Sequence, residues 1–382
     1  MTASAKVSLS ADGQRLTLDL DAQPREFAAL WLRERTPDAE TLDPGTGQRL
    51  IEAAELPLDL ALEEAEIDGT ALALRFNDGH AAHFPLAELR DAQPAENAPR
   101  ASVAAGRTLW DAGLAEPPRA DFAAALDDDA TLLAMLDDLH RVGFVLVSGV
   151  PTDEDGMQTL IEHVGPLRRT NWGGIADVKS VANAYDLTMT QRGLEPHTDN
   201  PYRDPIPGYI WLHCLTNAAD GGANTLVDGY RAAQLLRERD PAAFECLTRV
   251  TPGFRYQDET TWLESEGPLI ELDSQGRVSR VRYNNRTERV AALPAEELAR
   301  YYAARRAFYE LLTSDELTVH LKLDPGQMLI MDNYRLLHGR GAFELAGGVR
   351  HLRQGYVDRD STASRRLVLR RRLAENRMEE TA

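Results

Sequence analysis

A histidine and a carboxylate stand two positions apart at His197 and Asp199. In an extended chain alternate side chains point to the same face, so the imidazole and the carboxylate can bind one metal ion together. A second histidine, His338, lies far downstream and is followed directly by glycine and arginine. Two histidines and one carboxylate that leave other coordination positions open are the ligand set of non-haem Fe(II) oxygenases. The three residues therefore predict an open iron site.

A His-x-Asp pair alone is weak evidence, because nine histidines and 61 acidic residues can place one by chance in a solvated turn. The joint pattern is stronger, since Arg350 follows His338 by twelve residues. Further segments run in order through the same half of the chain: Leu212-His213-Cys214, Gly221-Gly222, Val227-Asp228-Gly229, Tyr283-Asn284-Asn285, Leu323-Asp324-Pro325-Gly326, Asp332-Asn333 and Arg350-His351-Leu352. With them the chain resembles the Fe(II)/2-oxoglutarate dioxygenases related to taurine dioxygenase, and most of all their gamma-butyrobetaine hydroxylase branch.

The resemblance implies that His197, Asp199 and His338 bind Fe(II) and leave three positions for the cosubstrates 2-oxoglutarate and O2. The distal carboxylate of 2-oxoglutarate needs a cation, and a guanidinium matches a carboxylate with two parallel hydrogen bonds. Arg350 is the expected partner by its position after His338, with Arg353 as the alternative. Asn224 resembles the family position that touches 2-oxoglutarate near the iron, although a small hydroxyl residue is usual there.

Aromatic faces attract a poorly hydrated trimethylammonium group. Trp172, Tyr185 and Tyr356 fall at three cage positions of the butyrobetaine pattern, and a fourth is occupied by Ala176. Each aromatic residue taken singly is more often a core residue. The three together favour a cage, and hence a small quaternary ammonium compound as substrate.

The anion end departs from that pattern. Asn285 matches the asparagine that contacts the substrate carboxylate, but Arg286 stands where an uncharged residue is expected, and Asn200 is also atypical. A phosphonate approaches two negative charges, so an added guanidinium suits it better than a carboxylate. This resembles bacterial 2-(trimethylamino)ethylphosphonate hydroxylases, and such a phosphonate is the expected substrate. In the alternative, Arg286 points outward or pairs with Glu288.

Two other functions stay open beside the phosphonate hydroxylase. One is gamma-butyrobetaine hydroxylation, which forms carnitine. The other is a protein without oxygenase activity, either a metal-binding jelly roll or an inactive scaffold. The presence of Arg350 discriminates, because a sensor or storage protein needs no buried cation for a dicarboxylate, and the intact triad argues against an inactive scaffold.

The elements that must position these residues read as mixed α and β. Leucines at helical spacing predict an amphipathic helix at 130–141, and further helices are expected at 153–164, 230–239 and 296–312. Short strands are expected at 143–147, 181–185, 210–215, 225–227, 319–323 and 328–331. The fold that the resemblance implies is α+β, a double-stranded β-helix (jelly roll) with flanking helices.

A small β-rich N-terminal domain is expected at 1–95, where Leu16, Leu18 and Leu20 alternate with polar residues and Asp78-Gly79 marks a hairpin turn. In many relatives a cysteine cluster after Trp-Leu-Arg binds zinc, but no cysteine follows Trp31 here, so this domain is expected to lack zinc. Residues 96–120, rich in alanine and proline, are expected to form a surface linker, and 121–382 the catalytic domain.

Composition narrows the function classes. The excess of 61 acidic over 42 basic residues gives a net charge of −19, which argues against nucleic-acid binding. No apolar run approaches the ~20 residues needed to span a bilayer, and the N-terminus does not read as a secretory signal. Only Cys214 and Cys246 are present, too few for a disulfide framework, so a cytoplasmic setting is expected. A homodimer is possible by analogy with the relatives.

Overall fold

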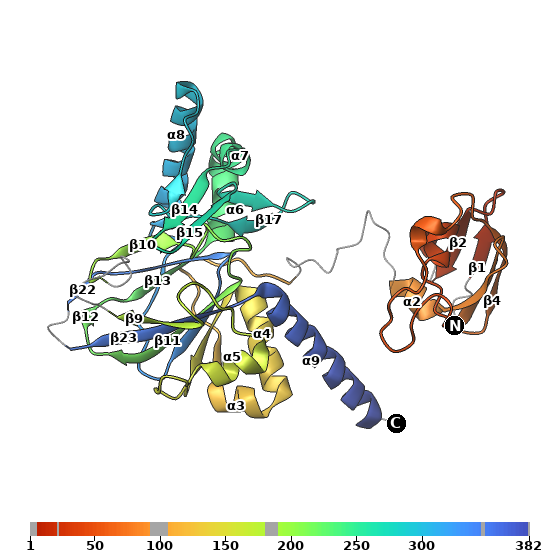
Figure 1. Cartoon of the computed structure of the whole chain (residues 1–382), viewed down its shortest axis with the longest axis horizontal. Helices are drawn as coiled ribbons and strands as arrows, with labels where there is room; N and C mark the ends of the chain where they lie inside the picture. Colours follow the sequence, from red (N-terminus) through yellow and green to blue (C-terminus); the bar gives the residue numbers. More distant parts are fainter. Residues whose placement is uncertain (1–5, 21–22, 92–105, 180–189, 345–347, 381–382) are drawn as a thin grey trace. The chain divides into compact units, whose positions relative to one another are not determined.

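The computed structural model describes residues 6–20, 23–91, 106–179, 190–344 and 348–380 (Figure 1). The chain divides into two compact units, Met1–Ala105 and Gly106–Ala382, and each is described here by itself.

In the N-terminal unit the described residues form two three-stranded antiparallel sheets and three short helices. One sheet contains β1 (Lys6–Leu9), β2 (Arg15–Leu20) and β3 (Gln23–Ala28), and the other β4 (Leu62–Asp68), β5 (Ala71–Phe76) and β6 (Ala81–Pro85). The helices are α1 (Ala29–Arg33), η1 (Ala53–Glu55) and α2 (Leu86–Asp91). Leu16, Leu18 and Leu20 are buried as their alternation predicts, and Gly79 takes the positive φ of 87° that the β5–β6 turn requires.

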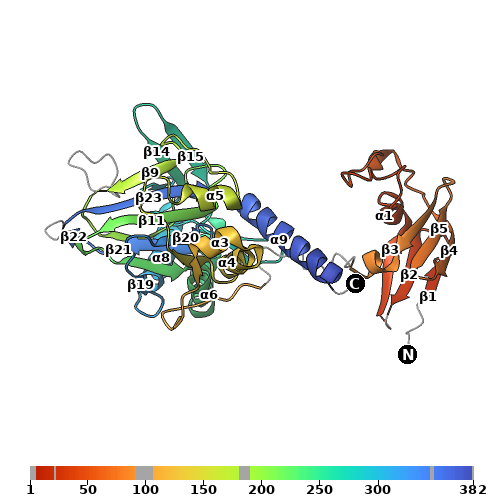
Figure 2. The same cartoon turned by 90° about the horizontal axis from the view of Figure 1, so that it is seen from below.

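The second unit is built on two sheets that form the predicted jelly-roll core. The smaller sheet has the order β10 (Leu194–His197), β21 (Leu336–Arg340), β13 (Asn224–Asp228) and β19 (Val319–Leu321). The larger has the order β7 (Arg119–Asp121), β8 (Phe144–Ser148), β20 (Met328–Asp332), β11 (Tyr209–Asn217), β23 (Arg350–Val357) and β9 (Ile175–Lys179). Figure 2 shows β9, β23 and β11 of the larger sheet side by side.

Strand periodicity explains how the larger sheet buries both faces. On β11, Ile210, Leu212 and Cys214 point into the core between the two sheets, together with Leu226 of the smaller sheet. Tyr209 and Trp211 point to the opposite face, where they join the core under the helices. Successive side chains of a strand alternate between faces, so β11 reads as a nearly continuous apolar run.

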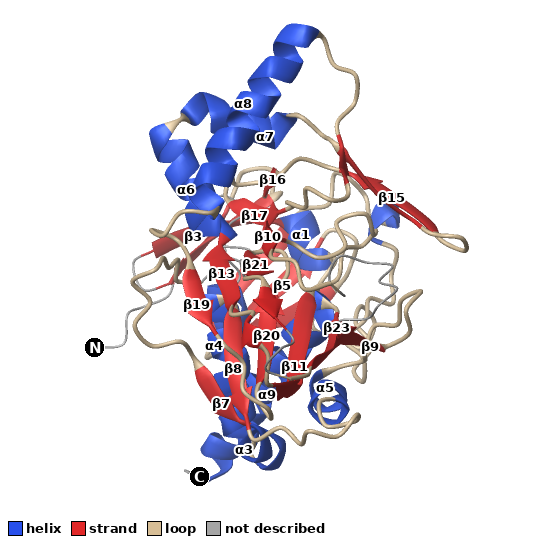
Figure 3. Cartoon of the chain, turned by 90° about the vertical axis from the view of Figure 1, so that its left-hand side faces the viewer, coloured by secondary structure: helices blue, strands red, loops and turns tan. Residues whose placement is uncertain are grey.

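Helices cover the two sides of the core, as Figures 1 and 3 show. On the side of the larger sheet lie α3 (Phe122–Asp127), α4 (Asp129–Val142), α5 (Gln158–Val164) and α9 (Arg359–Glu380). On the other side lie α6 (Gly229–Arg239), α7 (Pro241–Arg249) and α8 (Ala295–Leu312). Short strands complete this unit: β12 (Asp220–Gly221), β14 (Gly253–Gln257), β15 (Trp262–Glu266), β16 (Ile270–Leu272), β17 (Val278–Val281), β18 (Glu288–Arg289) and β22 (Phe343–Glu344).

Most predicted elements are confirmed, with two corrections. The helix predicted at 153–164 begins only at Gln158, because the Asp153 carboxylate accepts the N–H of Asp155 and holds a turn there. The linker predicted at 96–120 is wrong from residue 106 on. Trp110 is buried between the sheets and donates its Nε1–H to the Val142 carbonyl at 2.7 Å, so this segment belongs to the catalytic unit. The strand predicted at 181–185 lies outside the described residues.

No helix in the part of the chain that the structure describes is both long and apolar enough to cross a membrane.

Candidate metal and substrate site

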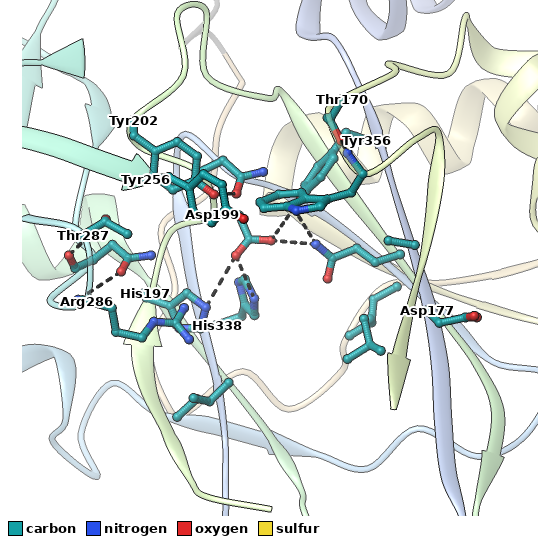
Figure 4. A pocket seen from close by; sticks show the side chains of 18 of the residues that line it. Thr170, Asp177, His197, Asp199, Tyr202, Tyr256, Arg286, Thr287, His338 and Tyr356 are labelled. Atoms are coloured by element: carbon teal, nitrogen blue, oxygen red, sulfur yellow. Dashed lines mark hydrogen bonds and ion pairs between the residues drawn. The ribbon is translucent and has the colours of Figure 1, made fainter. Parts of the chain in front are cut away.

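The three predicted metal ligands come together on neighbouring strands. His197 is the last residue of β10 and pairs in register with His338 on β21, while Asp199 follows two positions later. Their ligand atoms all lie within 4.8 Å of one another. The Asp199 Oδ1 atom is 3.5 Å from Nε2 of His197 and 3.7 Å from Nε2 of His338, and Figure 4 shows the three side chains converging.

Each histidine turns Nε2 toward the carboxylate of Asp199. Nδ1 of His197 lies 2.8 Å from the Glu195 carbonyl oxygen and donates to it, which fixes the orientation of the ring. The Nε2 atom of the same ring is buried and has no hydrogen-bond partner among the described residues. Burial, with a smaller contribution from His197, lowers the pKa of His338 to about 4, so its imidazole is neutral at neutral pH. A buried ring nitrogen of this kind, beside the neutral imidazole of His338, is suited to bind a metal ion.

The carboxylate of Asp199 is held at its second oxygen. Oδ2 accepts hydrogen bonds from the Tyr356 hydroxyl at 2.9 Å and from Gln354 Nε2 at 2.8 Å. Burial raises the pKa of Asp199, but the attraction of His338 and His197 in their protonated forms and the hydrogen bond from the Tyr356 hydroxyl lower it by more. The carboxylate is therefore charged and presents Oδ1 to the histidines.

The backbone of Asp199 is clamped by one side chain. The Asn333 Oδ1 atom accepts the Asp199 N–H at 2.7 Å, and its Nδ2 donates to the Asp199 carbonyl at 3.0 Å and to the Pro207 carbonyl at 3.0 Å. Before it, the Thr198 N–H donates to the Tyr283 carbonyl at 2.8 Å. These bonds fix the segment that carries the carboxylate on both of its sides.

The three ligands open into a cavity of about 950 Å³. Its lining includes, besides the ligands, Arg350, Asn224, Trp172, Tyr202, Tyr256, Tyr356, Gln354, Asn200, Asn284 and Arg286. One cavity thus joins the metal ligands to cationic, aromatic and amide side chains.

Arg350 lies in this cavity and Arg353 does not line it. Arg350 is 4% exposed, and the Nε atom of its guanidinium has no hydrogen-bond partner in the described ranges. Burial lowers the pKa of Arg350. Arg353, by contrast, donates to the Glu154 carbonyl and lies 3.3 Å from the carboxylate of Asp177. The guanidinium carbon of Arg350 lies 5.2 Å from the centre of the Phe343 ring, and no carboxylate pairs with it among the described residues. A buried cation is costly unless it is paired, so Arg350 fits an incoming carboxylate.

Aromatic residues form one wall of the cavity. Trp172 packs edge-on against Tyr256 with ring centroids 5.1 Å apart, and Tyr256 stacks on Tyr202 at 5.3 Å. Tyr202 and Tyr256 were not expected from the sequence, although Tyr202 stands only three positions after Asp199. Tyr356 lines the same cavity, whereas Tyr185 lies outside the described residues.

Arg286 and Asn200 reach the cavity with unpaired donors. Nη1 of Arg286 is buried, and neither it nor Nδ2 of Asn200 has a hydrogen-bond partner in the part of the chain that is described. Asn200 adopts a positive φ of 51° and accepts the Tyr202 hydroxyl at 2.6 Å. The alternative pairing of Arg286 with Glu288 is wrong, because Glu288 binds Arg305 at 2.9 Å.

Asn285 departs from its expected place. It is exposed, lines a separate cavity of about 180 Å³, and accepts a hydrogen bond from Arg305 at 3.0 Å. The preceding residue, Asn284, lines both cavities and donates to the Thr198 carbonyl at 3.0 Å. Sequence matching could not tell which of two adjacent asparagines turns inward.

Comparison with known proteins follows the same division of the chain. Residues 108–356 match the family described as "Taurine catabolism dioxygenase TauD, TfdA family", and residues 7–98 match "Gamma-butyrobetaine hydroxylase-like, N-terminal". A gamma-butyrobetaine dioxygenase of Pseudomonas sp. (strain AK-1) is 35% identical over 356 residues, covering 92% of each chain. The human gamma-butyrobetaine dioxygenase is 29% identical over 98% of this chain and 99% of its own, and the mitochondrial trimethyllysine dioxygenase of Mus musculus is 29% identical over 87% and 80%.

Among solved structures, a taurine dioxygenase from Burkholderia xenovorans is 17% identical with a TM-score of 0.47, covering 60% of this chain and 82% of its own. An asparagine oxygenase in complex with Fe(II), 3-hydroxyasparagine and succinate is 20% identical with a TM-score of 0.45, covering 60% and 79%.

Proposed function

Because this chain belongs to the TauD/TfdA family and is an Fe(II)- and 2-oxoglutarate-dependent dioxygenase, we propose that it hydroxylates a small trimethylammonium zwitterion. Gamma-butyrobetaine is the first candidate substrate. One observation carries the substrate proposal. The same cavity contains the metal ligands, an aromatic wall and the guanidinium of Arg286, whose buried Nη1 has no hydrogen-bond partner among the described residues. The likeness to gamma-butyrobetaine dioxygenases over 92% of both chains supports the same substrate.

The residues of the site fit both cofactors. His197, Asp199 and His338 would hold Fe(II), and Arg350, with Asn224 beside it in the cavity, would hold 2-oxoglutarate. When bound, the two supply the oxidising chemistry that inserts an oxygen atom of O2 into a C–H bond and releases succinate and CO2. The protein's part is to keep the His338 imidazole neutral and to orient the charged carboxylate of Asp199. Arg350 aligns the cosubstrate by its distal carboxylate.

The cationic end of the substrate would lie against the aromatic wall. A quaternary ammonium is poorly hydrated and donates no N–H hydrogen bond, so ring faces are suitable partners, worth about 0.5–2 kcal/mol each. Trp172 and Tyr202 each pack against Tyr256, and all three line the cavity together with Tyr356. This arrangement supports an ammonium subsite within reach of the metal.

The anionic end would meet Arg286 and Asn200. In the described part of the chain Nη1 of Arg286 and Nδ2 of Asn200 have no hydrogen-bond partner, so the first can give a carboxylate a charged donor and the second a neutral one. Asn285, placed in the separate cavity, has no part in this proposal.

A second substrate, 2-(trimethylamino)ethylphosphonate, is favoured by the same arginine. A phosphonate carries nearly two charges and three acceptor oxygens, so it could use a guanidinium and an amide more fully than a carboxylate does. The relatives named above are dioxygenases of gamma-butyrobetaine and trimethyllysine, so the phosphonate stands second.

A kinetic comparison tests these proposals. Wild-type kcat/KM is expected to be higher on gamma-butyrobetaine than on the phosphonate. It should fall about tenfold or more on 5,5-dimethylhexanoate, the carbon isostere that keeps the carboxylate but lacks the positive charge and so loses the cation–π interaction. Arg286→Ala should cost about 2 kcal/mol or more on gamma-butyrobetaine, roughly 30-fold, while Asn285→Ala serves as the neighbouring control and should change little.

Each contrary outcome has a definite meaning. A wild-type preference for the phosphonate would replace the first substrate by the second. Equal turnover of gamma-butyrobetaine and 5,5-dimethylhexanoate would contradict the ammonium subsite. An unchanged kcat/KM in Arg286→Ala would remove the arginine from substrate recognition.

A further inference from the structure

Three side chains close a small hydrogen-bonded ring beside the metal ligands. Tyr356 donates its hydroxyl hydrogen to Oδ2 of Asp199 at 2.9 Å. Gln354 donates one amide hydrogen to the same Oδ2 at 2.8 Å and the other to the Tyr356 hydroxyl oxygen at 2.6 Å. All three available hydrogens are used, so the ring has one consistent arrangement.

The ring divides the two oxygens of Asp199 between different tasks. Oδ2 accepts two hydrogen bonds, whereas Oδ1 faces Nε2 of His197 and of His338 at 3.5 and 3.7 Å. A carboxylate that binds a metal through both oxygens occupies one more coordination position than a carboxylate that binds through one. An iron site that must accept a chelating cosubstrate and O2 has no position to spare.

The geometry of β23 explains how one strand makes this arrangement. Gln354 and Tyr356 are two positions apart, so their side chains point to the same face of the strand. Arg350, four positions before Gln354, lies on that face too and lines the same cavity. One strand therefore aligns both the proposed cosubstrate anchor and the two donors to the metal carboxylate.

We propose that Gln354 and Tyr356 are positioning residues that hold Asp199 as a one-oxygen metal ligand and so keep the remaining coordination positions open. The proposal depends on the assignment of His197, Asp199 and His338 as the metal ligands, and it does not depend on which substrate the enzyme takes. It gives Tyr356 a task through its hydroxyl that is separate from any contact of its ring with the substrate.

Conservative variants separate this task from packing. Tyr356→Phe removes one hydroxyl and keeps the ring, and Gln354→Met removes the amide at similar length. Tyr256→Phe is the matched control, since it removes a hydroxyl from the same cavity that donates to Asp258 at 2.7 Å and not to Asp199.

Binding of Co(II), an ion that stands in for Fe(II) in air, is then measured by calorimetry in the absence of substrate. Tyr356→Phe and Gln354→Met should each weaken Co(II) binding about 10- to 100-fold, the range found when groups that orient metal ligands are lost. Tyr256→Phe should match the wild type. The Co(II) visible absorption, whose intensity depends on coordination number, should change in the first two variants alone.

The iron enzyme gives a second readout. Both variants should make more succinate per molecule of hydroxylated product than the wild type, because a misplaced carboxylate disturbs the site while the cosubstrate still binds. Wild-type Co(II) affinity, spectrum and succinate-to-product ratio in both variants would overturn the proposal. His197→Ala distinguishes the two levels of failure: if that variant keeps full Co(II) affinity, the ligand assignment itself is wrong.

Discussion

Replacing Arg350 by methionine removes a buried cation while keeping most of the side chain's length. In the structure the Arg350 residue is 4% exposed, and its Nε lacks a hydrogen-bond partner among the described residues. We expect two opposite consequences. The protein without cosubstrate should lose no stability, because a buried charge with no carboxylate beside it among the described residues is unfavourable and methionine fills similar space. Binding of 2-oxoglutarate should weaken sharply, because its distal carboxylate loses the cation that we propose as its partner.

The size of the second effect follows from the burial of the site. A desolvated pair of opposite charges is worth about 2–5 kcal/mol when one partner is removed, which corresponds to a roughly 30- to 5000-fold weaker affinity. An exposed pair would be worth less than about 1 kcal/mol. Arg353 offers that contrast on the same strand, because its guanidinium already pairs with Asp177.

The assay is 2-oxoglutarate binding to the Co(II)-loaded protein, with thermal unfolding followed in parallel. Arg350→Met should lose the rise in Tm that 2-oxoglutarate gives the wild type, while its Tm without cosubstrate stays equal or higher. Arg353→Met should bind 2-oxoglutarate within a few-fold of the wild type. The reasoning is refuted if Arg353→Met shows the loss and Arg350→Met does not.

Three further predictions concern the support of the site and the rest of the chain. Asn333→Ala removes two hydrogen bonds to the Asp199 backbone and one to the Pro207 carbonyl. It should lower the free energy of unfolding by about 2–4 kcal/mol and weaken Co(II) binding at least tenfold, and unchanged values would contradict the role of Asn333 in holding Asp199. Burial lowers the pKa of His213 to about 4, so the unfolded chain takes up this proton first as the pH falls. The free energy of unfolding should therefore fall below about pH 6.5, by about 2 kcal/mol at pH 5. Denaturant titrations at these two pH values should show a smaller difference in His213→Phe, and an unchanged difference would contradict the role of His213. Elemental analysis of protein purified without added metal should find no stoichiometric zinc, because both cysteines, Cys214 and Cys246, lie outside the N-terminal unit; one zinc per chain would contradict this.

The sequence was informative where chemistry depends on local spacing. His197 and Asp199 are two positions apart, so a short extended segment followed by a turn is enough to bring both side chains to one metal site. Strand alternation likewise predicted which face of β2 is buried. Arg350 lines the cavity from β23, a strand of eight residues whose alternate side chains turn inward, and its contact with 2-oxoglutarate stays a prediction.

Long-range packing could not be read in the same way. Tyr256 lines the cavity from β14, a strand that carries none of the sequence motifs, and no local pattern marks this residue. Trp110 was assigned to a linker because its neighbours are alanines, prolines and charged residues, yet one indole suffices to bury that segment. Gln354 has no signal at all in the sequence, since its role depends on a hydrogen bond to a residue 155 positions away.

Single turnover with labelled dioxygen tests the central claim most directly. The protein is loaded anaerobically with Fe(II), 2-oxoglutarate and gamma-butyrobetaine, then exposed to isotopically labelled O2, and succinate and product mass are measured. The account predicts equal amounts of succinate and a hydroxylated product that carries label from O2, and neither from His197→Ala. Succinate without any hydroxylated trimethylammonium product, across both proposed substrates, would contradict the proposed substrate class, and full activity of His197→Ala would contradict the site itself.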